Sequence, residues 1–333
     1  MQFKPSGIFL AIGLACATLS TGVLAGLDEG ITAYANKDYA AALQVLKPMA
    51  QRGDAGAQYI LGQMYALGQA VPQDAKEAAR WLRLAADQGI RLAQYNLGAM
   101  YDSGQGVQQD SKEAFKWYRM AAEQGYASAQ NNLGVMYDFG QGVSIDVKEA
   151  VKWFRLAADQ GDASAQLNLA ARYANGRGLP QDYKEAEKWY RLAADQGSAP
   201  SQYGLGLLHA AGRGVPVNYK EAVKWFRMAA EQRHAAAQNN LGAMFALGQG
   251  MPASRVVAHA LYSVSGTNDP SGNNRASANA KALAPSMSAK ELAASQTLVQ
   301  ELSKPGNFLQ ALDQYTSKPT VKETASTAAT PTK

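Results

Sequence analysis

The stretch KEAFKWYRMAAEQG, residues 112–125, is one of five near-copies along this chain of 333 residues. It returns as KEAVKWFRLAADQG at 148, KEAEKWYRLAADQG at 184 and KEAVKWFRMAAEQR at 220, after KEAARWLRLAADQG at 76. Each copy therefore begins 36 residues after the one before it. A fixed period of this length indicates stacked helical hairpins, because a single hairpin cannot bury its apolar face alone. The sequence predicts an all-α solenoid of helix-turn-helix repeats.

A less closely copied helix precedes each of these stretches. In ASAQNNLGVMY, residues 127–137, the residues Ala129, Leu133 and Met136 have the spacing of one helix face. The GQGV loop at 140–143 follows it, and paired glycines adopt turn conformations that are forbidden to other residues. Two recurring columns are interpreted as packing devices: the tryptophans Trp81, Trp117, Trp153, Trp189 and Trp225, and the glycines Gly98, Gly134 and Gly206.

The pattern LGxMYxxGxGVxxDxxKEAxxWYRxAAxQG resembles the Sel1-like repeat, a relative of the tetratricopeptide repeat, in an exported bacterial member of that family. The resemblance covers a solenoid over residues 54–265, and residues 26–53 resemble a plain tetratricopeptide hairpin that would cap its N-terminal end. It implies a right-handed α-superhelix in which the first helix of each pair lines the concave side. It also implies an adaptor role toward proteins or envelope components.

The N-terminal segment has the pattern of a signal peptide over residues 1–25. Lys4 precedes an apolar stretch from residue 8 to 24, and small or β-branched residues end it at Val23 and Ala25. We expect cleavage after Ala25 and a periplasmic or secreted protein with no membrane span in the mature chain; an uncleaved anchor is the alternative. Cys16, the only cysteine, lies in a sequence similar to a lipoprotein box, but Gly13 stands where such boxes usually carry leucine.

Past the repeats the pattern weakens. Residues 266–286 are rich in turn-forming residues and are interpreted as a linker. A capping helix is expected over residues 287–312, opened by Ser288 with Glu291 three residues later. Residues 313–333 carry many threonines and no large apolar cluster, which predicts a disordered tail.

No motif for catalysis, metal binding or a cofactor stands out. The histidines His209, His234 and His259 lie 25 residues apart, out of step with the period, and no zinc-ligand spacing occurs. The formal net charge of +5 is mild, so nucleic acid is not expected as a partner. We therefore predict a non-enzymatic protein without a cofactor; a peptidoglycan-acting hydrolase is the distant alternative.

Exposed positions that vary between repeats are the predicted recognition surface. In the first helix of the second repeat, Tyr95 and Asn96 oppose the buried arc that contains Leu97 and Met100. Tyrosine and asparagine columns in a concave groove can hold an extended peptide, although the asparagine ladder can equally bond the neighbouring repeat. The predicted partner-binding residues are Tyr95, Asn96, Asp102, Asn131, Asn132, Asp138, Phe139, Asn168 and Tyr203.

A basic stripe on the copied helix supports a second hypothesis. Lys112, Lys116 and Arg119 lie on one side of that helix, with Glu113 beside them, and the same set recurs in later copies. The stripe is either an ordinary solvated face or a contact surface for anionic glycan or lipid. The leading prediction is a scaffold that binds a protein or peptide, and the alternative is a scaffold for peptidoglycan or exopolysaccharide.

Overall fold

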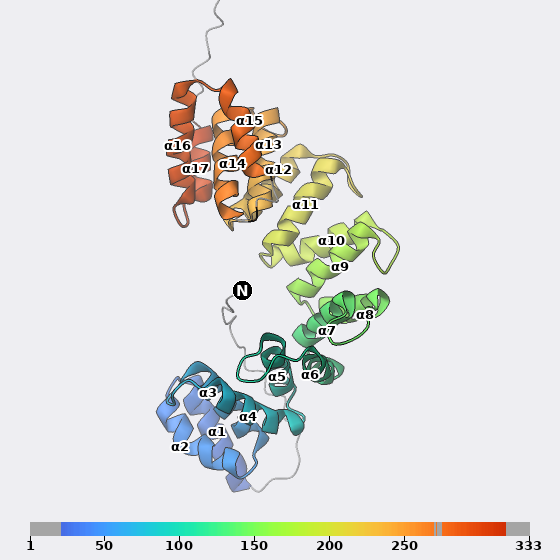
Figure 1. Ribbon diagram of the computed structural model, residues 1–333, viewed down its shortest axis with the longest axis vertical. Coiled ribbons are helices and arrows are strands. Elements are labelled where there is room, and N and C mark those ends of the chain that lie inside the picture. The colour runs from blue at the N-terminus through green and yellow to red at the C-terminus, as the bar shows by residue number, and fades with distance from the viewer. Residues whose placement is uncertain (1–20, 270, 272–274, 318–333) are drawn as a thin grey trace, which may run out of the picture. The chain divides into compact units, whose positions relative to one another are not determined.

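The structure is a computed structural model that describes the backbone of residues 21–269, 271 and 275–317, and side chains from residue 26 onward (Figure 1). The predicted signal peptide thus lies outside the described residues, apart from the backbone of residues 21–25. Every regular element in the described part is helical, and none is a strand. The predicted all-α repeat fold with a period of about 36 residues is confirmed.

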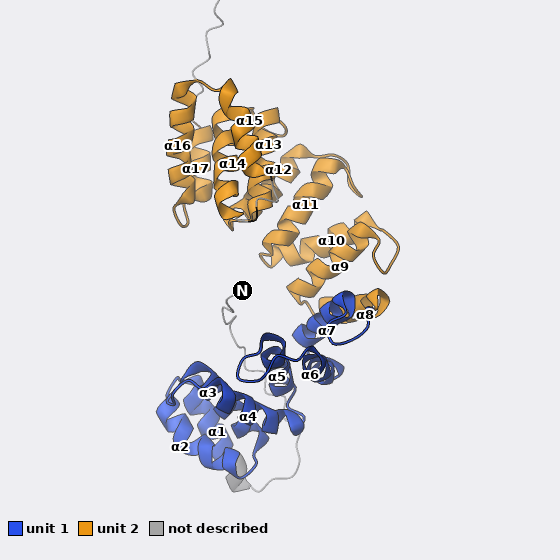
Figure 2. Cartoon of the chain, in the orientation of Figure 1, with its two compact units in different colours: residues 1–145 blue, residues 146–333 orange. Residues whose placement is uncertain are grey.

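The chain divides into two compact units, residues 1–145 and 146–333 (Figure 2). Within each unit, successive helices pair as antiparallel hairpins that contact the next hairpin. Unit 1 contains α1 (Thr21–Ala35), α2 (Tyr39–Gln51), α3 (Ala55–Leu67), α4 (Ala75–Asp87), α5 (Arg91–Ser103), α6 (Ser111–Glu123) and α7 (Ala127–Phe139). Unit 2 contains α8 (Val147–Asp159), α9 (Ala163–Asn175), α10 (Tyr183–Asp195), α11 (Ala199–Ala211), α12 (Tyr219–Glu231), α13 (Ala235–Leu247), α14 (Arg255–Asn268), α15 (Ala276–Leu283), the short 3₁₀ helix η1 (Ala284–Ser286), α16 (Ala289–Ser303) and α17 (Phe308–Thr316).

Aspartates begin the copied helices, but the glutamates do not close a reciprocal capping box. Asp110 Oδ1 accepts hydrogen bonds from the backbone amides of Lys112 and Glu113, at 2.8 and 3.2 Å. These two bonds satisfy backbone amides that a helix N-terminus otherwise leaves unpaired. The Glu113 carboxylate instead accepts the indole N–H of Trp117 at 3.0 Å. The same bond joins Trp189 to Glu185 at 3.1 Å, so at these two positions the glutamate holds the tryptophan in place.

The GxG loop locks one repeat onto the one before it. Gly106 has φ +70°, a conformation open mainly to glycine, and a Cβ there would lie 2.0 Å from the carbonyl oxygen of Ala75. The loop of the second repeat therefore rests directly on the first turn of α4. No other residue type fits at Gly106 without displacing that turn.

Buried tryptophans join successive hairpins within a unit. Trp117 is 2% exposed and packs with Ala78 and Leu82 on α4 of the preceding hairpin and with Leu97 on α5 of its own hairpin. Trp81, Trp189 and Trp225 are also buried, whereas Trp153 is half-buried. At these positions the indole fills the gap between two hairpins.

A column of buried glutamines, visible in the sequence only as a period, adds a second link between repeats. The side-chain amide of Gln94 donates to the carbonyl of Ala86 at 3.1 Å, and its oxygen accepts from Gln124 at 2.7 Å. Each glutamine thus caps the helix before it and binds the end of the helix after it. The same donor bond is made by Gln58, Gln94, Gln130, Gln166, Gln202 and Gln238.

The C-terminal region is more regular than the sequence indicates. The stretch 266–286, predicted as a linker, contains the end of α14, then α15 and η1. The segment 287–312, predicted as one helix, is broken near Gly306 (φ +71°) into α16 and α17. The prediction missed α15 because its buried residues, Ala276 and Ala280, are too small to give a strong apolar period.

The end of the fold is held by α17, which extends past the predicted start of the tail at residue 313. Phe308 and Leu312 are buried in the same core cluster as residues of α12, and Asp313 binds Arg227 of α12 at 2.5 Å. The capping box expected at Ser288 and Glu291 is present at the start of α16. Residues 318–333 lie outside the described part. Among the helices described, none is both long enough and apolar enough to cross a bilayer.

Candidate partner-binding site

Two aromatic rings lie close to that of Tyr95 in unit 1. The ring of Tyr95 on α5 lies 5.6 Å from that of Tyr118 on α6 and 5.0 Å from that of Tyr126, the residue before α7. Tyr118 is buried against Gly98, where only a glycine leaves room for the ring. Burial raises the pKa of the Tyr118 hydroxyl, so this phenol is neutral at ordinary pH. We call this set, Tyr95, Tyr118 and Tyr126, the unit 1 ring cluster.

Amide side chains of the asparagine column contact tyrosine hydroxyls. Burial raises the pKa of Tyr59 to about 12, while hydrogen bonds with Gln63 and Asn96 act in the opposite direction. A hydrogen bond with Asn132 likewise opposes the raised pKa of Tyr118. Asn96 and Asn132 each reach a tyrosine of the preceding repeat. The structural role that the sequence left open for the asparagine ladder is therefore supported at these two positions.

Unit 2 carries the same arrangement three repeats later. Tyr203 on α11 lies 5.9 Å from Phe226 on α12 and 4.8 Å from His234, the residue before α13, measured between ring centroids. Each of these three residues stands 108 positions after its counterpart in unit 1. Gly206 provides the close approach here, in the position that Gly98 holds in unit 1. We call Tyr203, Phe226 and His234 the unit 2 ring cluster.

An open concavity of about 540 Å³ adjoins the unit 2 ring cluster. Three of its side chains form a chain of hydrogen bonds that begins at Asn279 on α15. Asn279 Nδ2 donates to Asn239 Oδ1 at 2.9 Å, Asn239 Nδ2 to Asn240 Oδ1 at 3.5 Å, and Asn240 Nδ2 to Tyr203 Oη at 3.5 Å. Because the Tyr203 oxygen accepts in this chain, its own proton is available to an incoming acceptor. We call this surface the α11–α13 concavity; its lining residues are Tyr203, His234, Ala235, Ala236, Asn239, Asn240, Asn268 and Asp269.

The predicted partner-binding residues are distributed unequally. Tyr95, Asn96 and Asn132 lie together in unit 1, at or beside its ring cluster, and Tyr203 lies in unit 2. Asp102 is exposed, Phe139 is 60% exposed, and Asn168 is half-buried in unit 2. No single groove joining all nine is described, because they are divided between two units.

Two of the predicted contact residues are buried and so are not available on the surface. Asn131 is 9% exposed and Asp138 is 1% exposed. Both lie on α7, where the helix buries a wider arc than the one inferred from Ala129, Leu133 and Met136. The sequence argument assumed the same buried arc in every repeat, and α7 does not keep it.

Sequence reasoning missed the residues that precede the first helices. Tyr126 and His234 occupy the N-cap positions of α7 and α13, where Asp54 and Asp162 cap α3 and α9. An aromatic ring in place of a small polar cap was the available signal. It pairs with a tyrosine 31 positions earlier, on the first helix of the preceding hairpin, and a helical wheel cannot show a contact between two hairpins.

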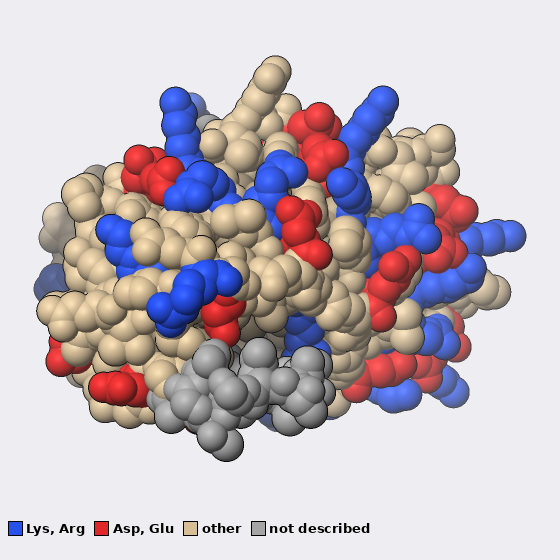
Figure 3. Space-filling model, turned by 90° about the horizontal axis from the view of Figure 1, so that it is seen from below, with Lys and Arg blue, Asp and Glu red and all other residues tan. Residues whose placement is uncertain are grey.

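The basic stripe is largely neutralised within each helix. Lys152 Nζ lies 2.6 Å from the Glu149 carboxylate, and Lys224 lies 3.3 Å from Glu221. On the face drawn in Figure 3, basic and acidic side chains are interspersed. Salt bridges between residues this exposed contribute little, and they leave no continuous positive surface in this pattern. The solvated-face interpretation is favoured over a glycan-binding stripe.

The described residues show no grouping of three or more metal-ligating side chains. His209 is 9% exposed, and neither of its ring nitrogens has a hydrogen-bond partner among the described residues. It faces Glu187, Arg191 and Glu221 across α10 and α12, and burial lowers its pKa. This environment keeps the ring neutral and encloses it in the core.

Helical pairs with a fixed period, glutamine links and GxG loops define a repeat scaffold of the α-solenoid class. The Sel1 repeat model matches residues 55–90, 91–126, 127–162, 163–198, 199–234 and 235–265, which is more than half of the sequence. The chain therefore belongs to the Sel1 repeat family. Proteins of this family are generally scaffolds for protein interactions.

One solved structure agrees with this assignment, and a second is reported beside it. A Sel1 repeat protein from Oxalobacter formigenes is 31% identical, with a TM-score of 0.66, over 72% of this chain and 96% of its own. A protective antigen present in uropathogenic Escherichia coli strains is 25% identical, with a TM-score of 0.41, over 93% of this chain and 97% of its own. No curated protein matches the chain.

Proposed function

We propose that this protein is a non-enzymatic scaffold that binds an extended segment of a partner protein in the α11–α13 concavity. The observation that carries the proposal is the bond from Asn279 to Asn239. Asn279 lies on α15, outside the matched repeats, so a chain segment that is not part of the solenoid already uses this amide column. A partner backbone offers the same amide donors and acceptors.

The chemistry of the concavity suits a peptide better than a charged glycan. Its side chains supply two aromatic rings, three amides and one carboxylate, and no lysine or arginine lines it. Amides can pair with a peptide backbone while rings cover its side chains. Lys188 on α10 and Lys224 on α12, which could attract an anionic polymer, are paired with glutamates.

We also propose that the protein acts outside the cytoplasm, as the predicted leader indicates. Lys4, the apolar stretch that follows it and the small residue Ala25 support this proposal. In that setting, the partner is a protein of the bacterial envelope or of the surroundings. The scaffold role does not depend on this location.

A library of random linear peptides displayed on phage, selected on the full protein, tests the proposed site. Peptides that are enriched should bind with an affinity that falls on the order of tenfold in a variant with Tyr203→Phe and Asn240→Ala, because it removes polar partners but keeps the ring packing. The matched control Lys188→Glu should leave binding unchanged. Unchanged binding in the double variant would refute the site, and loss only in Lys188→Glu would favour the anionic-glycan alternative.

A further inference from the structure

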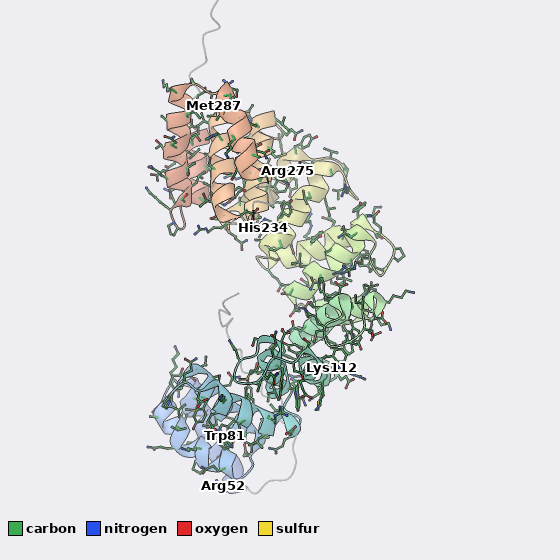
Figure 4. The ribbon with its side chains drawn as sticks, viewed as in Figure 1. Arg52, Trp81, Lys112, His234, Arg275 and Met287 are labelled. Carbon is green, nitrogen blue, oxygen red and sulfur yellow. The ribbon has the colours of Figure 1, made fainter. Side chains whose placement is uncertain are left out.

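The side chain of His234, labelled in Figure 4, makes two different contacts at the edge of the α11–α13 concavity. Its Nδ1 accepts a hydrogen bond from the backbone amide of Ala237 at 3.2 Å, so the side chain is the N-cap of α13. Its ring also lies 4.8 Å from that of Tyr203, with the two planes 32° apart. A single neutral imidazole therefore caps one helix and covers the tyrosine of another.

This cap differs in chemistry from those at the same position in other repeats. Asp54, Asp162 and Ser198 cap α3, α9 and α11 through oxygen atoms, which keep accepting hydrogen bonds throughout the neutral and mildly acidic range. Ile90 and Tyr126 make no side-chain cap bond. Among these positions, His234 alone has a capping atom that becomes a donor when it is protonated near neutral pH.

Protonation of His234 is incompatible with its present position for two reasons. A protonated Nδ1 has no lone pair, so it cannot accept from Ala237. The cation would also face the positive end of the α13 dipole, at which a positive charge is unfavourable. Burial lowers the pKa of His234, while a hydrogen bond with its own backbone, separate from the one with Ala237, acts in the opposite direction.

The charged groups around the ring do not offset these costs. α13 has no charged residue, and Tyr203 faces the ring from α11 with its pKa raised by burial. At the end of α12, Glu231 is exposed, and the Arg233 guanidinium donates to Asn268 at 3.1 Å. After α14, Asp269 lines the concavity and accepts from the Ser271 amide at 3.0 Å.

We propose that His234 makes partner binding in the α11–α13 concavity sensitive to acid. The neutral ring keeps the concavity in the conformation that binds the partner. Protonation breaks the α13 cap, separates the ring from Tyr203 and so releases the partner. The binding half of this proposal rests on the proposed function; the opening of the cap does not. The device would let a scaffold of constant fold exchange partners between neutral and acidic surroundings.

Amide hydrogen exchange in the full protein tests the cap without any partner. After correction for intrinsic exchange rates, protection at Ala237 should fall about fivefold between about pH 7.5 and about pH 5, the loss expected for a broken N-cap. His234→Asn keeps an oxygen cap that does not titrate and should abolish the fall. The first turn of α11, capped by Ser198, is the internal reference. Equal pH dependence in the parent and in His234→Asn would overturn the switch.

Peptides selected at neutral pH then test the coupling to binding. Their affinity for the parent should weaken about fivefold over the same pH range, and their affinity for His234→Asn should stay constant. His259→Asn, which changes a half-buried histidine away from the concavity, should keep the pH dependence of the parent. If the cap opens while affinity stays flat, regulation of this site is refuted. If no peptide binds at any pH, the proposed function fails, and the exchange data decide the switch alone.

Discussion

Replacing Gly206 by alanine tests whether this column of glycines exists to admit a ring from the facing helix. A Cβ at Gly206 would lie 2.4 Å from Cε1 and 2.5 Å from Cδ1 of Phe226. Carbon atoms in contact normally stay about 3.5–4 Å apart, so the ring would have to move by more than about 1 Å. Phe226 is 1% exposed and packs among Leu241, Phe245 and other residues of the unit 2 core, so that space is filled.

Two opposing effects set the size of the change. Alanine is favoured over glycine inside a helix by about 1 kcal/mol, whereas overpacking a core typically costs about 1–3 kcal/mol. Because the space around Phe226 is filled, we expect an overpacking cost in the upper part of this range, about 2–3 kcal/mol, so Gly206→Ala should lower the free energy of unfolding by about 1–2 kcal/mol. If the glycine had no packing role, the same substitution would stabilise the protein. The sign of the effect therefore decides between the two explanations.

Urea denaturation followed by far-ultraviolet circular dichroism measures this change. Gly56→Ala on α3 is the matched control, because a Cβ there makes only ordinary contacts at 3.4–3.6 Å, and it should stabilise the protein by about 0.5 kcal/mol. Phe226→Leu should partly rescue Gly206→Ala, since leucine faces the equivalent glycine at Gly62. A Gly206→Ala variant as stable as its parent, or more stable, would refute the reasoning.

Four further outcomes are expected. Gly204→Asn, which restores the asparagine found in other repeats, should destabilise the protein by about 1–3 kcal/mol in urea melts. The reason is that the ring of Tyr190 lies 2.9 Å from a Cβ built at this position. No loss of stability would show that this ring moves freely. Trp117→Ala should cost about 3–5 kcal/mol in the same assay through the cavity it leaves, and a small change would mean that the indole is not needed between hairpins. Burial lowers the pKa of all three histidines, so the unfolded chain binds protons more readily than the folded one. The free energy of unfolding should therefore be constant above about pH 6.5 and fall as the pH drops toward the lowered pKa values, less steeply in His209→Tyr. Melting temperatures that do not change with pH would contradict this. Intact-mass analysis of the exported protein should show Gly26 as its first residue, and a retained Met1 would disprove the predicted cleavage.

The ring clusters show why contacts between hairpins were beyond the sequence argument. Tyr95 and Tyr203 were selected as exposed, variable positions, yet each contacts a ring 31 positions later in the chain, just before the next hairpin begins. Whether a side chain faces solvent or a neighbouring repeat depends on how two hairpins pack, and a helical wheel describes only one helix. The same limit explains why Asp138, placed on the surface by its wheel position, is buried.

The sequence by itself determined the local structure and its repetition. The 36-residue period, the aspartates before the copied helices and the glycines after them specify where helices begin and end, because capping and turn chemistry act within a few residues. Only the tertiary structure decided how those helices are used. It bonded Gln94 both to Ala86 of the preceding repeat and to Gln124 of its own repeat, assigned the Glu113 carboxylate to Trp117, and set α15 beside the amide column through Asn279. Each of these contacts depends on how side chains and helices pack against one another, and the 36-residue pattern does not specify that packing.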